Sequence, residues 1–319
     1  MPDAGTVLCL LSRRNIVKEN KKKIRKIKKS LPLYLLLLPA IVYVFVFNYM
    51  PMYGAQIAFR NFSVKKGILG SDWVGLKYFA KFITYPKFLL LLKNTLVLGL
   101  YNLATFPCAI IFALLLNEVK NVKFKKSVQM ISYVPHFLST VVVCSMIDLF
   151  FHPNSGVINK IIELMGRTAQ DFLTIPEYFS HIFTWSGVWQ QLGWNAIIYV
   201  AALAGISGEL VEAAKIDGAN RMQVIWHINL PGILPTIAIT LIMTCGSILN
   251  VGFEKVFLLQ NSLNLSASQV ISTYVYEVGL QGGQFSYSAA IGLFNNLVNV
   301  AMLGIVNYLS KKMSGTGIW

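Results

Sequence analysis

Hydroxyl and amide side chains recur at helical spacing in two long apolar stretches of this chain. The first row lies in residues 233–253 at intervals of four, four, three and three residues, and comprises Thr236, Thr240, Thr244, Ser247 and Asn250. The second row lies in residues 285–310 and comprises Ser288, Gly292, Asn295, Asn296 and Asn299. Each spacing places its residues on one face of a helix. These uncharged donors and acceptors suit a neutral ligand with many hydroxyl groups, such as a glycan.

A third stretch, 182–206, combines amides with aromatic rings that could stack on the apolar faces of sugars. We expect the ligand path to include Trp189, Gln190, Asn195, Tyr199, Thr244, Ser247, Asn250, Asn295, Asn296 and Asn299. Two plainer explanations stay open. Small polar residues also link membrane helices, at about 0.6 kcal/mol per hydrogen bond, and Trp and Tyr collect at membrane surfaces. The rows contain no basic residue for an acidic glycan, although Arg60, Lys65 and Lys66 lie outside them.

Residues suited to covalent, metal or nucleotide chemistry do not cluster in the sequence. The four cysteines and four histidines are scattered, so we expect neither a metal site nor a disulfide framework. No GxxxxGK[ST] loop occurs, so the chain does not cradle ATP phosphates itself. Asp148, Glu254 and Lys255 lie close to the ends of apolar stretches, and none has the central position of a buried proton relay.

The elements that carry these rows are long, uncharged and apolar. Of the 319 residues, 55% are hydrophobic and only 13% are charged, against about 25% charged in soluble domains. A helix needs about 20 apolar residues to cross a bilayer. The sequence therefore predicts an all-α membrane protein with six transmembrane helices, at about 31–50, 95–117, 128–148, 182–206, 233–253 and 285–310.

The cations explain both the orientation and the formal net charge of +15. Ten lysines and arginines precede the first predicted span, in a basic segment at 1–30. With that end inside, about twice as many cations fall on the cytoplasmic side as on the outer side, as the positive-inside rule requires. Both termini, including a tail at 311–319, are therefore predicted to be cytoplasmic. The basic segment suits anionic lipid headgroups, and we expect no nucleic-acid partner.

One cytoplasmic loop, 207–231, is unusually ordered for a connection between two spans. Ser207 is placed to cap a helix, and Asp217-Gly218 is placed to end it. A second short helix is expected at 219–228, closed by Pro231. Its exposed apolar side chains suit either a partner-binding surface or a loop that lies on the bilayer.

The spacing in this loop resembles the EAA signature of permease subunits of bacterial ABC importers. Glu212-Ala213-Ala214 is followed by Gly218 after three residues, Ile228 after nine more, and then Leu230-Pro231. Seven such matches would coincide by chance on the order of once in 10⁸ windows. The resemblance implies the type I importer permease fold and a coupling loop that docks on an ATPase. In it Glu212 makes a polar contact, Ala213 and Ala214 allow close approach, Asp217-Gly218 bends the chain, and Ile228, Leu230 and Pro231 lead back to the membrane.

Two further stretches are similar to the oligosaccharide and polysaccharide branch of that family, which includes importers of alginate oligosaccharides. They are Asn48 to Phe79 and the terminal LSKKMSGTGIW. The resemblance implies import across the cytoplasmic membrane by a non-catalytic subunit. Its partners would be a second permease, more often a different chain, two ATP-binding cassette subunits that hold ATP and Mg, and an extracytoplasmic solute-binding protein.

Two other functions are compatible with a chain of this size and composition. A secondary sugar transporter would move its substrate under an ion gradient without partners. A membrane-embedded transferase for lipid-linked sugars would need clustered acidic residues at one interface, whereas Asp148, Glu163, Asp171 and Glu177 show no paired spacing.

Overall fold

The computed structural model describes residues 30–314, with side-chain detail to residue 312. Most of the basic segment at 1–30 and the end of the tail at 311–319 lie outside these residues. The chain divides into two compact units after Gln56. The first described unit is helical from residue 30, through the π-helix η1 (Phe45–Tyr49) and α2 (Met50–Gly54). The candidate span Ser30–Phe59, to which it contributes, has no buried residue in its most apolar window.

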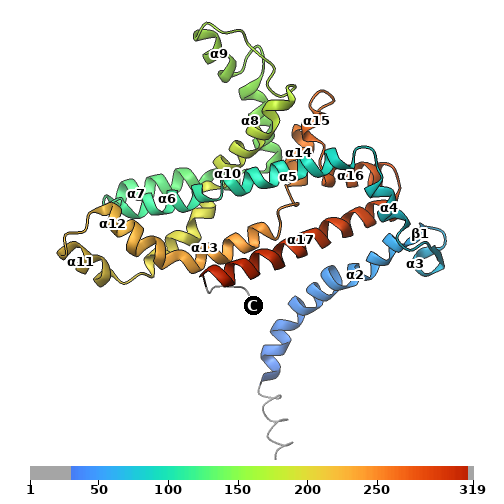
Figure 1. Ribbon diagram of the computed structural model, residues 1–319, viewed down its shortest axis with the longest axis horizontal. Helices are drawn as coiled ribbons and strands as arrows, with labels where there is room; N and C mark the ends of the chain where they lie inside the picture. The colour runs from blue at the N-terminus through green and yellow to red at the C-terminus, as the bar shows by residue number, and fades with distance from the viewer. Residues whose placement is uncertain (1–29, 315–319) are drawn as a thin grey trace, which may run out of the picture. The chain divides into compact units, whose positions relative to one another are not determined.

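The second unit is built around long apolar helices (Figure 1). Its main helices are α5 (Phe88–Ala104), α6 (Pro107–Glu118), α10 (Pro176–Ala204), α13 (Leu230–Cys245) and α17 (Phe285–Ser314). Across the described residues, four helical stretches are long and apolar enough to span a membrane, and two bent helix pairs bring the number to six. The α5–α6 run counts as one such stretch.

Shorter elements connect the long helices of the second unit. The helices are η2 (Ala55–Phe59), which crosses the boundary, α3 (Gly67–Gly70), α4 (Lys77–Ile83), α7 (Val122–Tyr133), η3 (Val134–Phe137), α8 (Thr140–Phe151), α9 (Val157–Leu164), α11 (Gly208–Ile216), α12 (Arg221–Val224), η4 (Ile225–Asn229), α14 (Phe253–Leu259), α15 (Leu265–Ser268), α16 (Ile271–Tyr276) and η5 (Glu277–Gln281). The antiparallel strands β1 (Arg60–Ser63) and β2 (Ser71–Trp73) form a hairpin, paired as Arg60 with Trp73 and Asn61 with Asp72.

The helix around the predicted span 128–148 is broken. The segments Val122–Phe137 and Thr140–Phe151 meet at 102°. Pro135 tightens the chain into the 3₁₀ turn η3, and Ser139 then starts α8 by accepting a hydrogen bond from the Val142 backbone N–H (3.3 Å). The uncharged run at 128–148 therefore predicts apolar surroundings, but it does not predict a straight helix.

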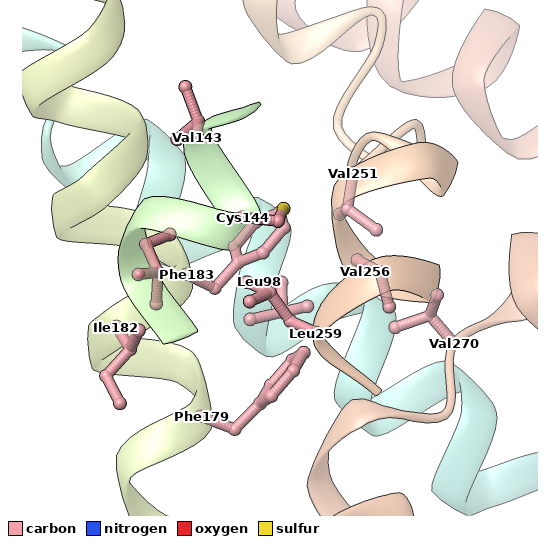
Figure 2. Close-up of a cluster of buried hydrophobic side chains, with 11 residues drawn as sticks. Leu98, Val143, Cys144, Phe179, Ile182, Phe183, Val251, Val256, Leu259 and Val270 are labelled. Atoms are coloured by element: carbon pink, nitrogen blue, oxygen red, sulfur yellow. The ribbon is translucent and has the colours of Figure 1, made fainter. Parts of the chain in front are cut away.

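Buried side chains from four helices form one hydrophobic cluster (Figure 2). The cluster joins α5, α8, α10 and α14 through Leu98, Val143, Cys144, Ile147, Phe179, Ile182, Phe183, Val256 and Leu259, with Val251 and Val270 from the flanking loops. Because Val256 is fully buried in it, the neighbouring Lys255 is held against α10.

Close backbone contact joins α10 to α7 at Gly193. A Cβ atom there would lie 2.3 Å from the Ser132 backbone oxygen, so any larger residue would push the helices apart. This contact fixes the face of α10 that carries Gln190 and Trp194.

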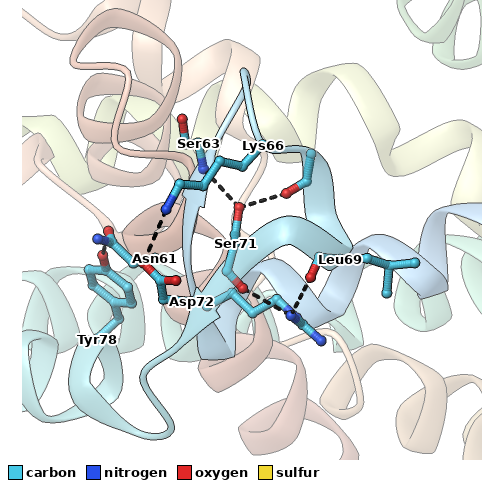
Figure 3. Close-up of polar contacts among 9 residues, drawn as sticks. Asn61, Ser63, Lys66, Leu69, Ser71, Asp72 and Tyr78 are labelled. Atoms are coloured by element: carbon cyan, nitrogen blue, oxygen red, sulfur yellow. Dashed lines mark hydrogen bonds and ion pairs between the residues drawn. The ribbon is translucent and has the colours of Figure 1, made fainter.

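The hairpin is held by a polar network of its own (Figure 3). Arg60 Nη1 donates to the backbone oxygens of Leu69 (3.3 Å) and Ser71 (3.0 Å), and Lys66 pairs with Asp72 at 3.5 Å. The hairpin contacts α17 through the Phe62 backbone N–H, which donates to Ser286 Oγ (2.9 Å). Arg60 and Lys66 therefore bind groups of the hairpin itself. From the sequence alone, both are cations that an acidic ligand could use.

Candidate functional site

The segment from α11 to η4 forms a sharp, well-capped elbow, which we define as residues 207–231. Helix α11 ends with a Schellman motif: the Gly218 N–H donates to Lys215 O (3.1 Å), and the Ala219 N–H donates to Ala214 O (2.8 Å). Gly218 has φ of +84°, a left-handed conformation that favours glycine. The predicted break at Asp217-Gly218 is confirmed.

Helix α12 starts immediately after this turn with a capping box. Asn220 Oδ1 accepts from the Gln223 backbone N–H (2.9 Å), and Gln223 Oε1 accepts from the Asn220 backbone N–H (2.7 Å). The Asn-x-x-Gln spacing of this box is visible in the sequence. Ser207 does stand at the start of α11, yet its side chain makes no capping hydrogen bond.

The predicted end of the second elbow helix at 228 is wrong. The helix runs on from Arg221 through Pro231 to Cys245 as one candidate span. Proline lacks the N–H that the next α-helical turn requires, and the helix accommodates it by widening into the π-turn η4, where the Leu230 N–H donates to Ile225 O. The same arrangement precedes Pro51, where the Met50 N–H donates to Phe45 O.

The elbow presents apolar and acidic side chains to its surroundings. Ile216 is 86% exposed, and Leu210, Met222 and Trp226 are each about 60% exposed. Glu212 and Ala213 are exposed and Ala214 is half-buried. Among the described contacts, none engages the Glu212 carboxylate. A groove of about 270 Å³ lies between the two elbow helices, lined by Ala214, Asp217, Gly218, Ala219, Gln223, Val224, His227 and Ile228.

A second candidate site is a cavity of about 620 Å³ between α5, α6, α10 and α13. Gln190, Asn195, Tyr199 and Thr244 of the predicted path line it, together with Thr240, Gln191 and Trp194. Tyr199 and Thr240 share a hydrogen bond of 2.9 Å between their hydroxyls. Parts of the fourth-span and fifth-span rows therefore face one space, and its size falls in the range of about 300–1,000 Å³ usual for ligand sites.

The sixth-span row lies elsewhere. Asn295 and Asn296 line a separate groove of about 440 Å³ between α16 and α17. Asn295 and Asn299 both donate from Nδ2 to Asn250 Oδ1, at 3.0 and 3.3 Å, and Asn299 Oδ1 accepts from the Leu249 N–H. These three asparagines link α17 to the turn that follows α13, which matches the alternative that polar residues hold membrane helices together.

Two other predicted path residues do not line the cavity. Trp189 is 47% exposed on the outside of α10, and the Ser247 hydroxyl donates back to carbonyls of its own helix. Neighbouring Trp194 takes the place expected for Trp189. Its ring stacks on His136 with centroids 4.1 Å apart and planes within 4°.

Sequence reasoning missed two functional candidates, His136 and Lys255. His136 Nδ1 shares a hydrogen bond with Gln191 Oε1 (2.8 Å), so the imidazole positions both Gln191 and Trp194. Lys255 lines the cavity and donates from Nζ to Phe183 O (2.9 Å). Burial lowers the pKa of Lys255 to about 8. A basic residue therefore does lie on the cavity wall.

The elbow and most of the residues that line the cavity lie inside a region that matches a known family. Residues 105–315 match the family described as binding-protein-dependent transport system inner membrane component.

The chain also has close relatives over nearly its whole length. It is 44% identical to the polygalacturonan/rhamnogalacturonan transport system permease YteP of Bacillus subtilis, with 95% of each chain covered, and 42% identical to Protein LplB of the same organism, with 92% of each covered. A crystal structure of a bacterial ABC transporter for the acidic polysaccharide alginate contains a chain with a TM-score of 0.84 and 38% identity, over 92% of this chain and 99% of that one.

This likeness confirms the predicted family and fold and leaves no support for the secondary transporter or the lipid-linked transferase. The chain belongs to the binding-protein-dependent family of inner-membrane permeases, the multi-pass, non-catalytic transport subunits of ABC importers.

Proposed function

We propose that this permease imports oligosaccharides rich in uronic acids, and that ATP hydrolysis on two partner subunits drives it through the elbow. The observation that carries the coupling proposal is the geometry of residues 207–231. A Schellman motif and a capping box fix the bend, while the Glu212 carboxylate and the Ile216 side chain stay uncovered. Such a rigid, partly apolar projection suits a groove on another protein.

The acidic character of the substrate is proposed from the relatives and from the cavity. One relative is named for transport of polygalacturonan and rhamnogalacturonan, both of which contain galacturonic acid, and the similar solved structure is described as an importer of acidic alginate. The cavity supplies amides and hydroxyls for sugar hydroxyl groups, and the Trp194 ring for an apolar sugar face. It also contains one cation, which a neutral glycan does not require.

We propose the orientation from the elements at the two ends of the second unit. Figure 1 shows α11 and α12 at one end, and the hairpin and α4 at the other. We place the elbow in the cytoplasm beside the ATPase and the hairpin end toward the solute-binding protein. A solved complex of the alginate transporter with its oligosaccharide-bound periplasmic protein supports a binding protein as partner.

The other proposed partners are two ATP-binding cassette subunits and a second permease. The sequence contains no phosphate-binding loop, so ATP and Mg would be held by two ATP-binding cassette subunits. A second permease, in our proposal a different chain, would close the other side of the translocation path. ATP binding would draw the cassettes together, pull the elbow and open the cavity outward, and hydrolysis would reset it inward.

Site-directed cross-linking in the purified complex tests the coupling proposal. In a chain whose native cysteines are replaced by alanine, a cysteine at Ala213 should cross-link to the ATPase subunit. A cysteine at Leu164, which is 88% exposed on α9, is the matched control and should not. Absence of an ATPase product from Ala213 in a complex that still imports substrate would refute the coupling role.

Import by the reconstituted complex tests the substrate. Proteoliposomes that contain both permeases and the ATPase, supplied with liganded binding protein, should take up trigalacturonate only when ATP is available to the ATPase. This chain alone should take up none under a proton or sodium gradient. Uptake by the isolated chain would restore the secondary-transporter hypothesis.

A further inference from the structure

Lys255 is held at the cavity wall by neutral groups only. Its Nζ donates to Phe183 O at 2.9 Å and lies 5.0 Å from the centroid of the Phe183 ring. An ammonium group has three N–H donors, so two of them have no acceptor among the described residues. Because Lys255 also lines the cavity, these donors are available to a molecule inside it.

No carboxylate in the described part of the chain neutralises this lysine. The one ion pair found between residues 30 and 314 joins Lys66 to Asp72 on the hairpin. Glu254, the adjacent residue, is exposed on α14 and does not pair with Lys255. The other titratable group near Lys255 is the Cys144 thiol of α8, which is not a carboxylate. The cavity therefore has an unbalanced positive charge on its wall.

Burial makes the charged form of Lys255 less favourable than it is in water. With a pKa of about 8, Lys255 is mostly charged at pH 7. A partly desolvated cation gains most from an anion that enters the same low-dielectric space. A bound carboxylate would accept the two remaining N–H groups in charge-assisted hydrogen bonds, which are about twice as strong as neutral ones.

Lys81 has contacts similar to those of Lys255, so a comparison of the two lysines shows which feature is particular to Lys255. Lys81 Nζ lies 4.3 Å from the centroid of the Tyr287 ring and donates to Gln284 Oε1 at 2.9 Å. It too contacts an aromatic ring and a neutral oxygen, but it is exposed to solvent and does not line the cavity. Aromatic and carbonyl contacts therefore do not account for the position of Lys255 at the cavity wall.

We propose that Lys255 binds a substrate carboxylate inside the cavity and thereby selects acidic over neutral oligosaccharides. This inference rests on the proposed import function. The Asn195 amide would bind sugar hydroxyls, and the side-chain oxygens of Gln190 and Thr244, whose donors bond to backbone carbonyls, would accept from them. Lys255 would add the charge that distinguishes a uronate from its neutral ester.

The test uses the reconstituted complex with saturating binding protein and ATP, and trigalacturonate as the probe. Lys255→Gln removes the charge but keeps an N–H donor for Phe183 O, and Lys255→Arg keeps both charge and donor. We expect Lys255→Gln to reduce trigalacturonate uptake about tenfold, which corresponds to about 1.4 kcal/mol, while Lys255→Arg and the matched control Lys81→Gln stay within about threefold of wild type. ATP hydrolysis stimulated by the binding protein should change little.

The possible outcomes separate this inference from the proposed function. If the wild-type complex imports no trigalacturonate, the substrate class and this inference both fall. If the wild type imports it and Lys255→Gln does as well as Lys81→Gln, the substrate class stands and the role of Lys255 is refuted. If Lys255→Gln and Lys255→Arg reduce trigalacturonate uptake equally, Lys255 is a structural residue and its proposed role is refuted. The same holds if Lys255→Gln reduces uptake of the methyl-esterified trisaccharide as much as uptake of trigalacturonate.

Discussion

Replacing Gly218 by alanine should weaken the grip of the ATPase on this permease while the membrane helices stay folded. In the structure Gly218 has φ of +84°, and an added Cβ would meet no atom within 4 Å. The substitution is therefore disfavoured by backbone strain alone, by about 1–2 kcal/mol for a non-glycine residue in the left-handed region. Asparagine tolerates this region better and should be less disruptive.

The expected loss of ATPase affinity follows from the strain at Gly218 and the contacts that this residue allows. The Schellman motif that Gly218 allows satisfies two carbonyl groups, of Lys215 and Ala214. If the bent elbow is the form that docks, strain of 1–2 kcal/mol reduces ATPase affinity by up to about five- to thirtyfold. Gly218→Asn should lose less than about threefold. Binding of purified ATPase to the detergent-solubilised permease pair, measured by titration, gives these ratios directly.

Gly166→Ala is the matched control for this experiment. Gly166 has φ of +77°, also with no atom within 4 Å of an added Cβ, but it follows α9 and lies outside the elbow. It should suffer similar local strain and leave ATPase affinity unchanged. If Gly218→Ala binds the ATPase as wild type does, or if Gly218→Asn is as defective as Gly218→Ala, the conformational reasoning is refuted. The second result would indicate that Gly218 is needed for close approach.

Three further predictions concern the elbow, the cavity and the helix contacts. Asn220→Ala removes the capping box, so it should cost the elbow about 1 kcal/mol and lower ATPase affinity in the same titration; unchanged affinity would contradict this. Because burial lowers the Lys255 pKa to about 8, the protonated fraction falls as pH rises through 8, and uptake of trigalacturonate relative to its methyl ester should drop between pH 7 and 9. A constant ratio would count against the charge. Asn250→Ala deletes the acceptor shared by Asn295 and Asn299, so it should destabilise the purified permease by about 0.6 kcal/mol per lost hydrogen bond, seen as a lower unfolding temperature, without altering that ratio.

The elbow shows where local sequence signals are sufficient. A glycine after an aspartate at the end of a helix predicts a left-handed turn because few other residues adopt positive φ, and Gly218 does so. The same reasoning wrongly predicts that the second elbow helix ends before Pro231. A proline normally ends a helix, but a π-turn before it keeps the helix continuous, and the sequence gives no direct signal for that turn.

The cavity shows where local signals stop. Thr240 and Thr244 have helical spacing, so their shared face could be predicted, and they do line one space. Asn295 and Asn299 have the same kind of spacing, yet they contact Asn250, because the helix packing decides which neighbour a face meets. Lys255 follows an apolar stretch by two residues, where a lysine usually reaches toward water. Its place at the cavity wall depends on contacts with α10 and α8 that are far away in the sequence.

The π-turn at Ile225–Asn229 has a mechanical consequence. It makes one uninterrupted rod from Arg221 to Thr240, about 30 Å at 1.5 Å per residue, so a twist applied at the cytoplasmic tip arrives at the Tyr199–Thr240 hydrogen bond with no loop to absorb it. The turn also sets the phase of that rod. If the same residues closed into an ordinary α-helical turn, everything downstream would rotate by roughly 100°, turning Thr240 and Thr244 away from the space they line while leaving the tip where it was.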